Sequence, residues 1–354
     1  MKHDLSRGFE YVHINRREGK PRTCGITEIR GPYYAPMGKR YLADILETMG
    51  EYVDILKFSG GSFALMPKRA VRELIDLCHE HKVLVSTGGF VERVLTQGPE
   101  AVDRYFEECR ELGFDIVEVS SGFLSIPLPD LVRLVERVGE HGMKAKPEVG
   151  IQFGAGGASS PEELEAEGTA DTSRAIRAAK TFLEAGASLV MIESEGITES
   201  VRSWRTDVAA KIADGVGLDK VMFEAADPAV FSWYVKNFGP DVNLFVDHSQ
   251  IVQLECLRSG IWGTAGTWGR VVTFKEPSKR ETASRPRLVE PRSKAGGGRP
   301  WRDTIAAWRT GTRWNTRPCR SNSGTFRNWP GGRTSPPRRG RRSRSGRSTP
   351  WGAP

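Results

Sequence analysis

A short apolar strand followed by an amphipathic helical stretch recurs eight times between residues 23 and 260 of this chain. Eight consecutive βα units are what a closed (β/α)8 barrel requires. The repeat therefore predicts an α/β protein with the TIM barrel fold. The expected strands are residues 24–29, 53–58, 83–87, 116–120, 144–149, 189–193, 220–225 and 243–247.

The segments between these strands show the period of an α-helix. In residues 67–81, the apolar Val71, Leu74 and Cys78 fall on one face, with charged residues largely opposite. Strands that alternate with helices are expected to be parallel, since antiparallel strands need no helical crossover. An open doubly wound sheet is the alternative, but it would place a G-x-G-x-x-G turn after the first strand. Residues 30–33 read Arg-Gly-Pro-Tyr, so we favour the barrel.

Charge divides the chain into two parts of opposite sign. The formal net charge is +8, but residues 276–354 hold 20 Lys and Arg against 4 Asp and Glu, which leaves −8 for residues 1–275. A segment so rich in Arg, Gly and Pro cannot bury enough apolar surface to offset the entropy of ordering it, which predicts a disordered basic tail. We expect an N-terminal extension over residues 1–22, the barrel over residues 23–275 and the tail over residues 276–354.

The tail has three interpretations. We favour a frameshift or readthrough product, because a GC-rich frame translated beyond a shifted or missed stop codon gives this mixture of Arg, Gly, Pro and Trp. A solvated tail without a specific partner comes second. Nucleic-acid binding by the Arg-rich residues 338–344, through contacts to phosphates, is the least favoured.

Cysteine spacing and hydropathy indicate the cellular compartment in which the protein is expected to reside. The five cysteines share no C-x-x-C spacing and no pairing with His of the metal-binding type, which is typical of a reduced protein. The first residues lack the apolar centre of a signal peptide, and no apolar run reaches the roughly 18 residues that a membrane span needs. The sequence therefore predicts a soluble cytoplasmic protein without a membrane partner.

Charged residues gather where the predicted strands end, and this end of a parallel barrel carries the active site. The acids there are Glu28, Glu118, Glu148, Glu193, Glu195, Glu224 and Asp247. Clustered carboxylates repel one another unless a cation shares the site, and their oxygens suit a hard divalent cation, for which we expect Mg²⁺. The alternative is a polar layer that closes the barrel, in which the acids pair with Arg30, Lys57, Lys144 or Lys146.

Glycine-rich turns follow the second, third and fifth strands. Backbone amides in such turns can approach an anion, so they predict a phosphate or carboxylate substrate. Sharp turns between barrel elements also favour glycine, which is the alternative explanation. The expected substrate-binding residues at these turns and at two further strand ends are Ser59, Gly60, Thr87, Gly88, Gly89, Ser120 and His248. A contact to Asp247 is the second interpretation of His248, and the loop over residues 154–171 is long enough to predict a lid.

Six segments in order along the chain resemble the phosphosulfolactate synthase family, and most closely the branch that includes the plant heat-stress-associated 32-kDa proteins. They are DILKFSGGS at 54–62, VSTGG at 85–89, KAKPEVG at 144–150, MIESEGI at 191–197, VMFEAADP at 221–228 and VNLFVDHSQIVQLECLR at 242–258. The resemblance spans residues 23–275 and leaves the tail outside it. It implies a (β/α)8 barrel, dependence on magnesium and, often, a homo-oligomer.

The family's activity implies a specific reaction. It adds sulfite to phosphoenolpyruvate to give (2R)-phospho-3-sulfolactate, in the route to coenzyme M. Sulfite attacks the methylene carbon, charge accumulates on the carboxylate as an enediolate, and a proton then reaches the carbon that bears the phosphate. Mg²⁺ on the carboxylate would stabilise that charge, and a lysine could donate the proton.

The family segments assign roles to individual residues. Lys57 lies in the K-F-x-x-G segment, Glu118 in V-E-[IV]-S, Glu148 in E-V-G, Glu193 in I-E and Glu224 in F-E-A. We expect catalysis from three residues: Lys57, Glu118 and Lys146. We expect the metal ligands to come from Glu148, Glu193, Glu224 and Asp247.

Two segments depart from the family pattern. The synthases carry a lysine soon after E-V-G, where this chain has Ile151-Gln152, and an E-x-R-E after the sixth strand, where this chain has Glu193-Ser194-Glu195. Both departures remove cations suited to a phosphate or a sulfonate. A second hypothesis follows, in which the protein is a non-catalytic stress-associated barrel that acts through protein contacts.

Overall fold

The computed structural model describes residues 8–151 and 172–262. All of them lie within the unit Met1–Ala283. The predicted lid over residues 154–171 and the predicted tail over residues 276–354 lie outside the described residues. Among the described helices, none is both long and apolar enough to cross a bilayer.

Eight parallel strands close into a barrel in the order β1 to β8, with β1 paired to β8. This confirms the (β/α)8 prediction. The strands are β1 (Thr27–Arg30), β2 (Ile55–Lys57), β3 (Leu84–Ser86), β4 (Ile116–Val119), β5 (Lys144–Val149), β6 (Val190–Ile192), β7 (Val221–Glu224) and β8 (Leu244–Asp247). Seven of the eight are one to three residues shorter than predicted, and the residues left out include apolar ones such as Val53 and Leu189.

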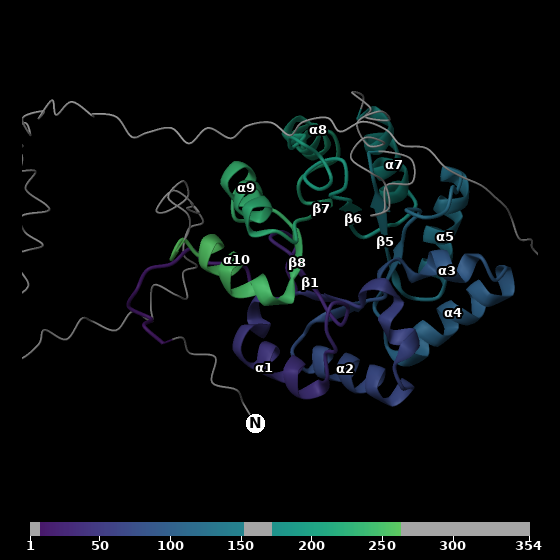
Figure 1. Cartoon of the computed structure of the whole chain (residues 1–354), viewed down its shortest axis with the longest axis horizontal. Coiled ribbons are helices and arrows are strands. Elements are labelled where there is room, and N and C mark those ends of the chain that lie inside the picture. Colours follow the sequence, from purple (N-terminus) through teal and green to yellow (C-terminus); the bar gives the residue numbers. More distant parts are fainter. Residues whose placement is uncertain (1–7, 152–171, 263–354) are drawn as a thin grey trace, which may run out of the picture. The chain divides into compact units, whose positions relative to one another are not determined.

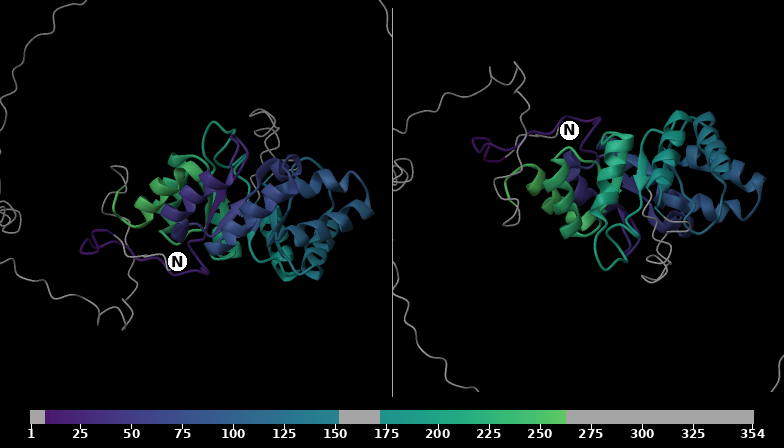
Figure 2. Two further views of the ribbon diagram at one scale, coloured as in Figure 1. Left: turned by 90° about the horizontal axis from the view of Figure 1, so that it is seen from below. Right: turned by 90° about the horizontal axis from the view of Figure 1, so that it is seen from above.

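Helices surround the strands (Figures 1 and 2). They are α1 (Lys39–Met49), α2 (Lys68–Glu80), α3 (Val91–Leu95), α4 (Pro99–Leu112), α5 (Leu128–Glu140), α7 (Ser173–Glu184), α8 (Thr206–Val216), α9 (Pro228–Phe238) and α10 (Ile251–Arg258). Short 3₁₀ turns are η1 (Gly50–Tyr52), η2 (Ser59–Leu65), η3 (Gly88–Phe90) and η4 (His248–Gln250). In α2 the predicted apolar face is the buried one, with Val71, Leu74 and Cys78 against the strands.

Two apolar regions lie on opposite sides of the strands. The larger fills the space between strands and helices. The smaller lies inside the barrel and consists of Ile55, Ile116, Leu189, Met191, Met222 and Phe245. Alternate residues of a strand point to opposite faces, so every second residue enters the barrel. On β5 these are Lys144, Lys146 and Glu148, which places three charged side chains at successive depths.

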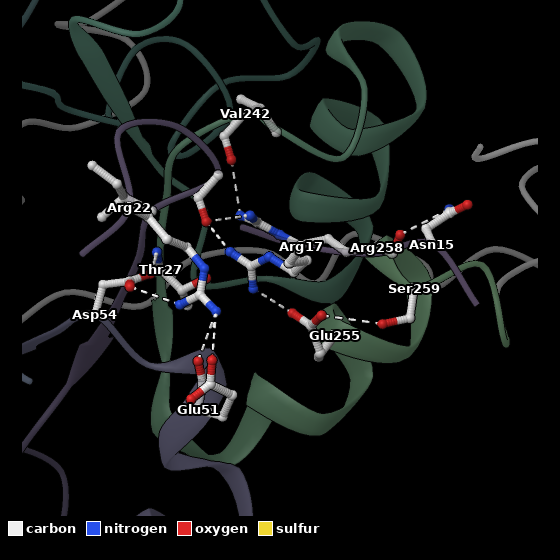
Figure 3. A network of polar contacts seen from close by, with 12 residues as sticks. Asn15, Arg17, Arg22, Thr27, Glu51, Asp54, Val242, Glu255, Arg258 and Ser259 are labelled. Carbon is white, nitrogen blue, oxygen red and sulfur yellow. Dashed lines mark hydrogen bonds and ion pairs between the residues drawn. The ribbon is translucent and has the colours of Figure 1, made fainter. Parts of the chain in front are cut away.

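A buried arginine joins both ends of the described chain at the amino-terminal end of the barrel (Figure 3). Arg258, fully buried at the end of α10, donates to the carbonyls of Gly25 at 2.7 Å and Val242 at 2.8 Å. Asn15 donates to the Arg258 carbonyl at 3.0 Å. Burial lowers the pKa of the Arg258 guanidinium to about 9. These hydrogen bonds offset part of the cost of burying the charge.

Ion pairs of Arg17 and Arg22 hold the N-terminal segment against the same end (Figure 3). Arg17 pairs with Glu255 of α10. Arg22 pairs with Asp54 at 2.8 Å, and the other oxygen of Asp54 accepts the backbone N–H of Thr27 at 2.9 Å. Residues 15–22 therefore contact the barrel directly, although the sequence alone placed them in an extension.

Candidate active site

Four charged side chains form a layer across the inside of the barrel. Lys57 of β2 lies 2.7 Å from Glu118 of β4, and Lys146 of β5 lies 3.0 Å from the second oxygen of the same carboxylate. Lys146 also forms an ion pair with Glu28 of β1. Glu28, Glu118 and Lys146 are at most 1% exposed, and Lys57 is 7% exposed. Two lysines thus balance two glutamates, and we call these four residues the ionic layer.

The ionic layer depends on compensation of buried charge. Burial alone would raise the pKa of Glu118, but Lys57 and Lys146 outweigh that effect and hold the pKa below its usual value. Burial would lower the pKa of Lys57, but Glu118 and then Glu148 raise it above the usual value, so Lys57 is a firmly held cation. Glu28 differs, because burial raises its pKa in spite of Lys146.

A second group of acids lies closer to the barrel mouth, and it has fewer cations. Burial and the charge of Glu118 raise the pKa of Glu148 to about 7, although its carboxylate lies 3.7 Å from Lys57. Burial and then the charges of Glu224 and Glu148 raise the pKa of Glu193 well above its usual value. Arg30 of β1 pairs with Glu224 at 2.9 Å. This acidic group is therefore a place where a proton or an added cation would relieve repulsion.

The expected metal ligands are only partly brought together. The charge of Glu224 raises the pKa of both Glu148 and Glu193, and the charge of Glu148 raises that of Glu193. Asp247 instead caps η4, where one oxygen accepts the amide of Ser249 at 3.0 Å and its hydroxyl at 2.6 Å. Over residues 8–151 and 172–262, no three His, Cys, Asp or Glu side chains converge as a preformed metal site. The donor set still fits a hard cation, because it offers carboxylate oxygens and excess negative charge.

His248 is held at the rim by contacts within the protein. Its Nε2 lies 2.9 Å from the hydroxyl of Tyr41, and its Nδ1 lies 3.0 Å from the carbonyl of Arg30. Nδ1 also lies 3.7 Å from Asp247. A substrate would have to replace one of these contacts to hydrogen-bond the ring, and substrate binding by His248 stays a prediction.

The glycines of η2 and η3 have a packing role. Gly60 and Gly88 adopt left-handed φ values of 61° and 60°. A Cβ on Gly60 would lie 2.4 Å from the ring of Tyr33, and a Cβ on Gly88 would lie 2.8 Å from a backbone oxygen. Gly89 lies against Ser120, whose hydroxyl would be 2.3 Å from an added Cβ. Close packing of the loops therefore requires these glycines, whether or not their amides also bind an anion.

The other two predicted substrate-binding residues are also engaged or buried. Thr87 donates its hydroxyl to the carbonyl of Gly88 at 2.9 Å. Ser59 is buried, and its hydroxyl has no hydrogen-bond partner among the described residues. A buried hydroxyl without a partner costs free energy, so Ser59 is the member of this set that a bound ligand would satisfy best.

Glu92 in α3 has a structural role that the sequence analysis missed. Its two carboxylate oxygens accept the hydroxyl of Ser120 at 2.6 Å and the amides of Gly122, Phe123 and Leu124 at 3.0, 2.8 and 3.1 Å. The side chain thereby organises the loop after β4 beside the ionic layer. Glu92 follows a turn rather than a strand, so the search for acids at strand ends could not find it.

A (β/α)8 barrel with buried lysines and carboxylates where its strands end defines the structural class of this protein. The family model of (2R)-phospho-3-sulfolactate synthase (ComA) matches residues 15–264. The chain therefore belongs to the (2R)-phospho-3-sulfolactate synthase family, as the six sequence segments predicted.

Individual relatives fall into two groups. Protein HEAT-STRESS-ASSOCIATED 32 of Arabidopsis thaliana is 42% identical over 252 residues, which cover 68% of this chain and 88% of the plant protein. Phosphosulfolactate synthase of Methanothermobacter thermautotrophicus is 29% identical over 262 residues, which cover 72% of this chain and 95% of the synthase. The synthase of Methanocaldococcus jannaschii is 28% identical over 240 residues, which cover 66% of this chain and 90% of that protein.

Proposed function

We propose that this protein is a phosphosulfolactate synthase-like lyase that adds sulfite to phosphoenolpyruvate with the help of Mg²⁺. The observation that carries the proposal is the position of Lys57, between Glu118 at 2.7 Å and Glu148 at 3.7 Å in the barrel interior. Lys57 is a charged group that attracts an anionic substrate, and its ammonium carries a proton that it can donate to the reacting carbon.

The reaction forms one carbon–sulfur bond and adds one proton to carbon. The sulfur lone pair of sulfite forms a bond to C3 of phosphoenolpyruvate, and the electrons of the C2–C3 double bond move onto the carboxylate. A proton then reaches C2, which completes (2R)-phospho-3-sulfolactate. Lys57 is the donor that we assign to this step, and Glu118, which forms ion pairs with both lysines of the ionic layer, keeps it oriented.

The acidic group at the mouth is where Mg²⁺ would bind. Glu148, Glu193 and Glu224 are the ligands we assign, with water and substrate oxygens completing the shell. A bound cation supplies Lewis acidity toward the developing enediolate. It would also reduce the repulsion that helps to raise the pKa of Glu148 and Glu193, and this relief would favour binding of the cation.

A non-catalytic role is the second candidate, and two observations favour it. The relative that shares 42% identity carries a heat-stress name rather than a synthase name. At the place where the synthase pattern has a basic residue, this chain has a buried apolar one, Ile151. Arg30, a remaining cation at the mouth, is already paired with Glu224.

Phosphorus NMR separates the two candidates. We expect a mixture of the protein, phosphoenolpyruvate, sulfite and Mg²⁺ to lose the phosphoenolpyruvate signal and gain that of a phosphate on a saturated carbon. Omission of sulfite or chelation of Mg²⁺ should each stop the conversion. Absence of conversion, combined with no rise in melting temperature when phosphoenolpyruvate and Mg²⁺ are added, would favour the non-catalytic role.

A further inference from the structure

A cavity of about 590 Å³ lies at the amino-terminal end of the barrel, opposite the mouth that carries the ionic and acidic groups. We call it the basal cavity. Its wall comes from residues that precede or begin the strands, among them Ile26, Asp54, Leu84, Lys144 and Lys220. Its volume falls within the range of about 300 to 1,000 Å³ that holds small organic ligands. In barrels of this fold the chemistry takes place at the opposite end, so the basal cavity is separate from the proposed reaction.

Charge around the basal cavity is strongly unequal. The cations that line it are Lys20, Arg22, Lys82, Lys144, Lys146 and Lys220, whereas its carboxylates are Asp54 and Asp219. Arg22 is neutralised by Asp54 at 2.8 Å, and Lys220 lies 3.3 Å from Asp219. A concave wall that carries one sign of charge concentrates ions of the opposite sign.

Lys82 and Lys144 supply the positive charge that is left over. Both side chains are exposed at the rim, at the points where the chain enters β3 and β5. Across residues 8–151 and 172–262, neither ammonium group has an ion pair or a hydrogen bond. Lys20 lies deeper and donates to the carbonyls of Gly50 at 2.6 Å and His81 at 3.0 Å.

The interior of the basal cavity is apolar. Ile55, Ile116 and Leu189, which belong to the apolar cluster inside the barrel, form its inner wall together with Ile26 and Leu84. An apolar inner wall below a cationic rim matches a molecule with one anionic head group and an apolar body. A bare inorganic ion would leave the apolar wall uncovered.

We propose that the basal cavity binds a small amphipathic organic anion, with its head group at Lys82 and Lys144 and its apolar body against Ile55, Ile116 and Leu189. Nothing in the proposed addition of sulfite depends on this site. Lys146, which borders the basal cavity and pairs with Glu28 and Glu118, lies between the two ends of the barrel.

Fluorescence titration with 8-anilinonaphthalene-1-sulfonate tests the proposal, since this probe has an aromatic body and one sulfonate. We expect saturable binding of one probe per chain. The double variant Lys82→Met and Lys144→Met should weaken it at least tenfold, because both head-group contacts are lost. The uncharged N-phenyl-1-naphthylamine should bind the double variant and the unchanged protein alike.

Two control variants separate the basal cavity from other sites. Lys236→Met removes an exposed lysine from the outer helix α9, and Glu224→Gln alters the barrel mouth. Both should bind the sulfonate probe within twofold of the unchanged protein. Equal affinity of the Lys82 and Lys144 double variant and the unchanged protein would overturn the proposal. So would binding that never saturates, or a tenfold loss of affinity in Glu224→Gln.

Discussion

Replacement of Lys146 by Met should reveal how strongly the ionic layer depends on charge balance. Lys146 is 1% exposed and pairs with both Glu28 and Glu118, so the substitution leaves two buried carboxylates with Lys57 as their nearest cation. Removal of one partner from a buried ion pair costs about 3 to 5 kcal/mol. For a domain of this size, that loss lowers the melting temperature by roughly 6 to 20 °C.

The pH dependence of the stability lost in Lys146→Met shows whether Glu28 is the group responsible. Burial already raises the pKa of Glu28, and without Lys146 that pKa should rise further. A carboxyl with a raised pKa binds its proton more tightly in the folded state, so its contribution to stability is present at low pH and is lost as pH rises. We therefore expect the deficit of Lys146→Met to be smaller at pH 5 than at pH 8.

Urea unfolding at both pH values measures this effect, with Lys144→Met as the matched control. Lys144 is two residues away on β5 but exposed and without a partner among the described residues, so its loss should change the unfolding free energy by less than about 0.5 kcal/mol. Adding Glu28→Gln to Lys146→Met should restore part of the stability. A loss below about 1 kcal/mol in Lys146→Met would refute the charge-balance argument.

Three further predictions concern the mouth and the tail. Glu148→Gln and Glu193→Gln should each weaken Mg²⁺ binding at least about tenfold in calorimetric titrations, and unchanged titrations in both would place the metal elsewhere. The pKa of Glu148 is raised to about 7, so the stability that its protonated form contributes should be lost as pH rises from about 4.5 to 7. Melting temperatures measured over this pH range should fall for the unchanged protein, and Glu148→Gln should not show this part of the fall. Truncation after Lys275 should leave the melting temperature unchanged, whereas a fall of several degrees would show that the tail packs on the barrel.

The sequence was sufficient to predict the barrel because its evidence is local and repeated. Each helix segment shows its own apolar face, as α2 does, and eight such units leave few other arrangements for the strands. The position of Lys57 at the end of β2 was predictable for the same reason. Closure of the barrel then brings it to Glu118 of β4, and the sequence had already placed both residues at the ends of predicted strands.

The choice of partner among several acids could not be read from the sequence. Glu28 and Lys146 lie 118 positions apart and meet across the barrel interior, which depends on the depth that each side chain reaches. Asp247 lies at a strand end like the other acids, yet it caps the turn that follows. Lys144 was a candidate for the polar layer, but it begins β5 and therefore lies at the opposite end of the barrel, on the basal cavity.

Turnover by Lys57→Met, compared with Lys236→Met, tests the central claim most directly. The substitution keeps the apolar stem of the side chain and removes the charge that Glu118 and Glu148 hold in the barrel. We predict a folded variant whose conversion of phosphoenolpyruvate and sulfite falls by at least about a hundredfold, the usual scale for loss of a general acid, while Lys236→Met keeps full activity. If Lys57→Met folds and retains its turnover, Lys57 is not the proton donor and the proposed chemistry is contradicted.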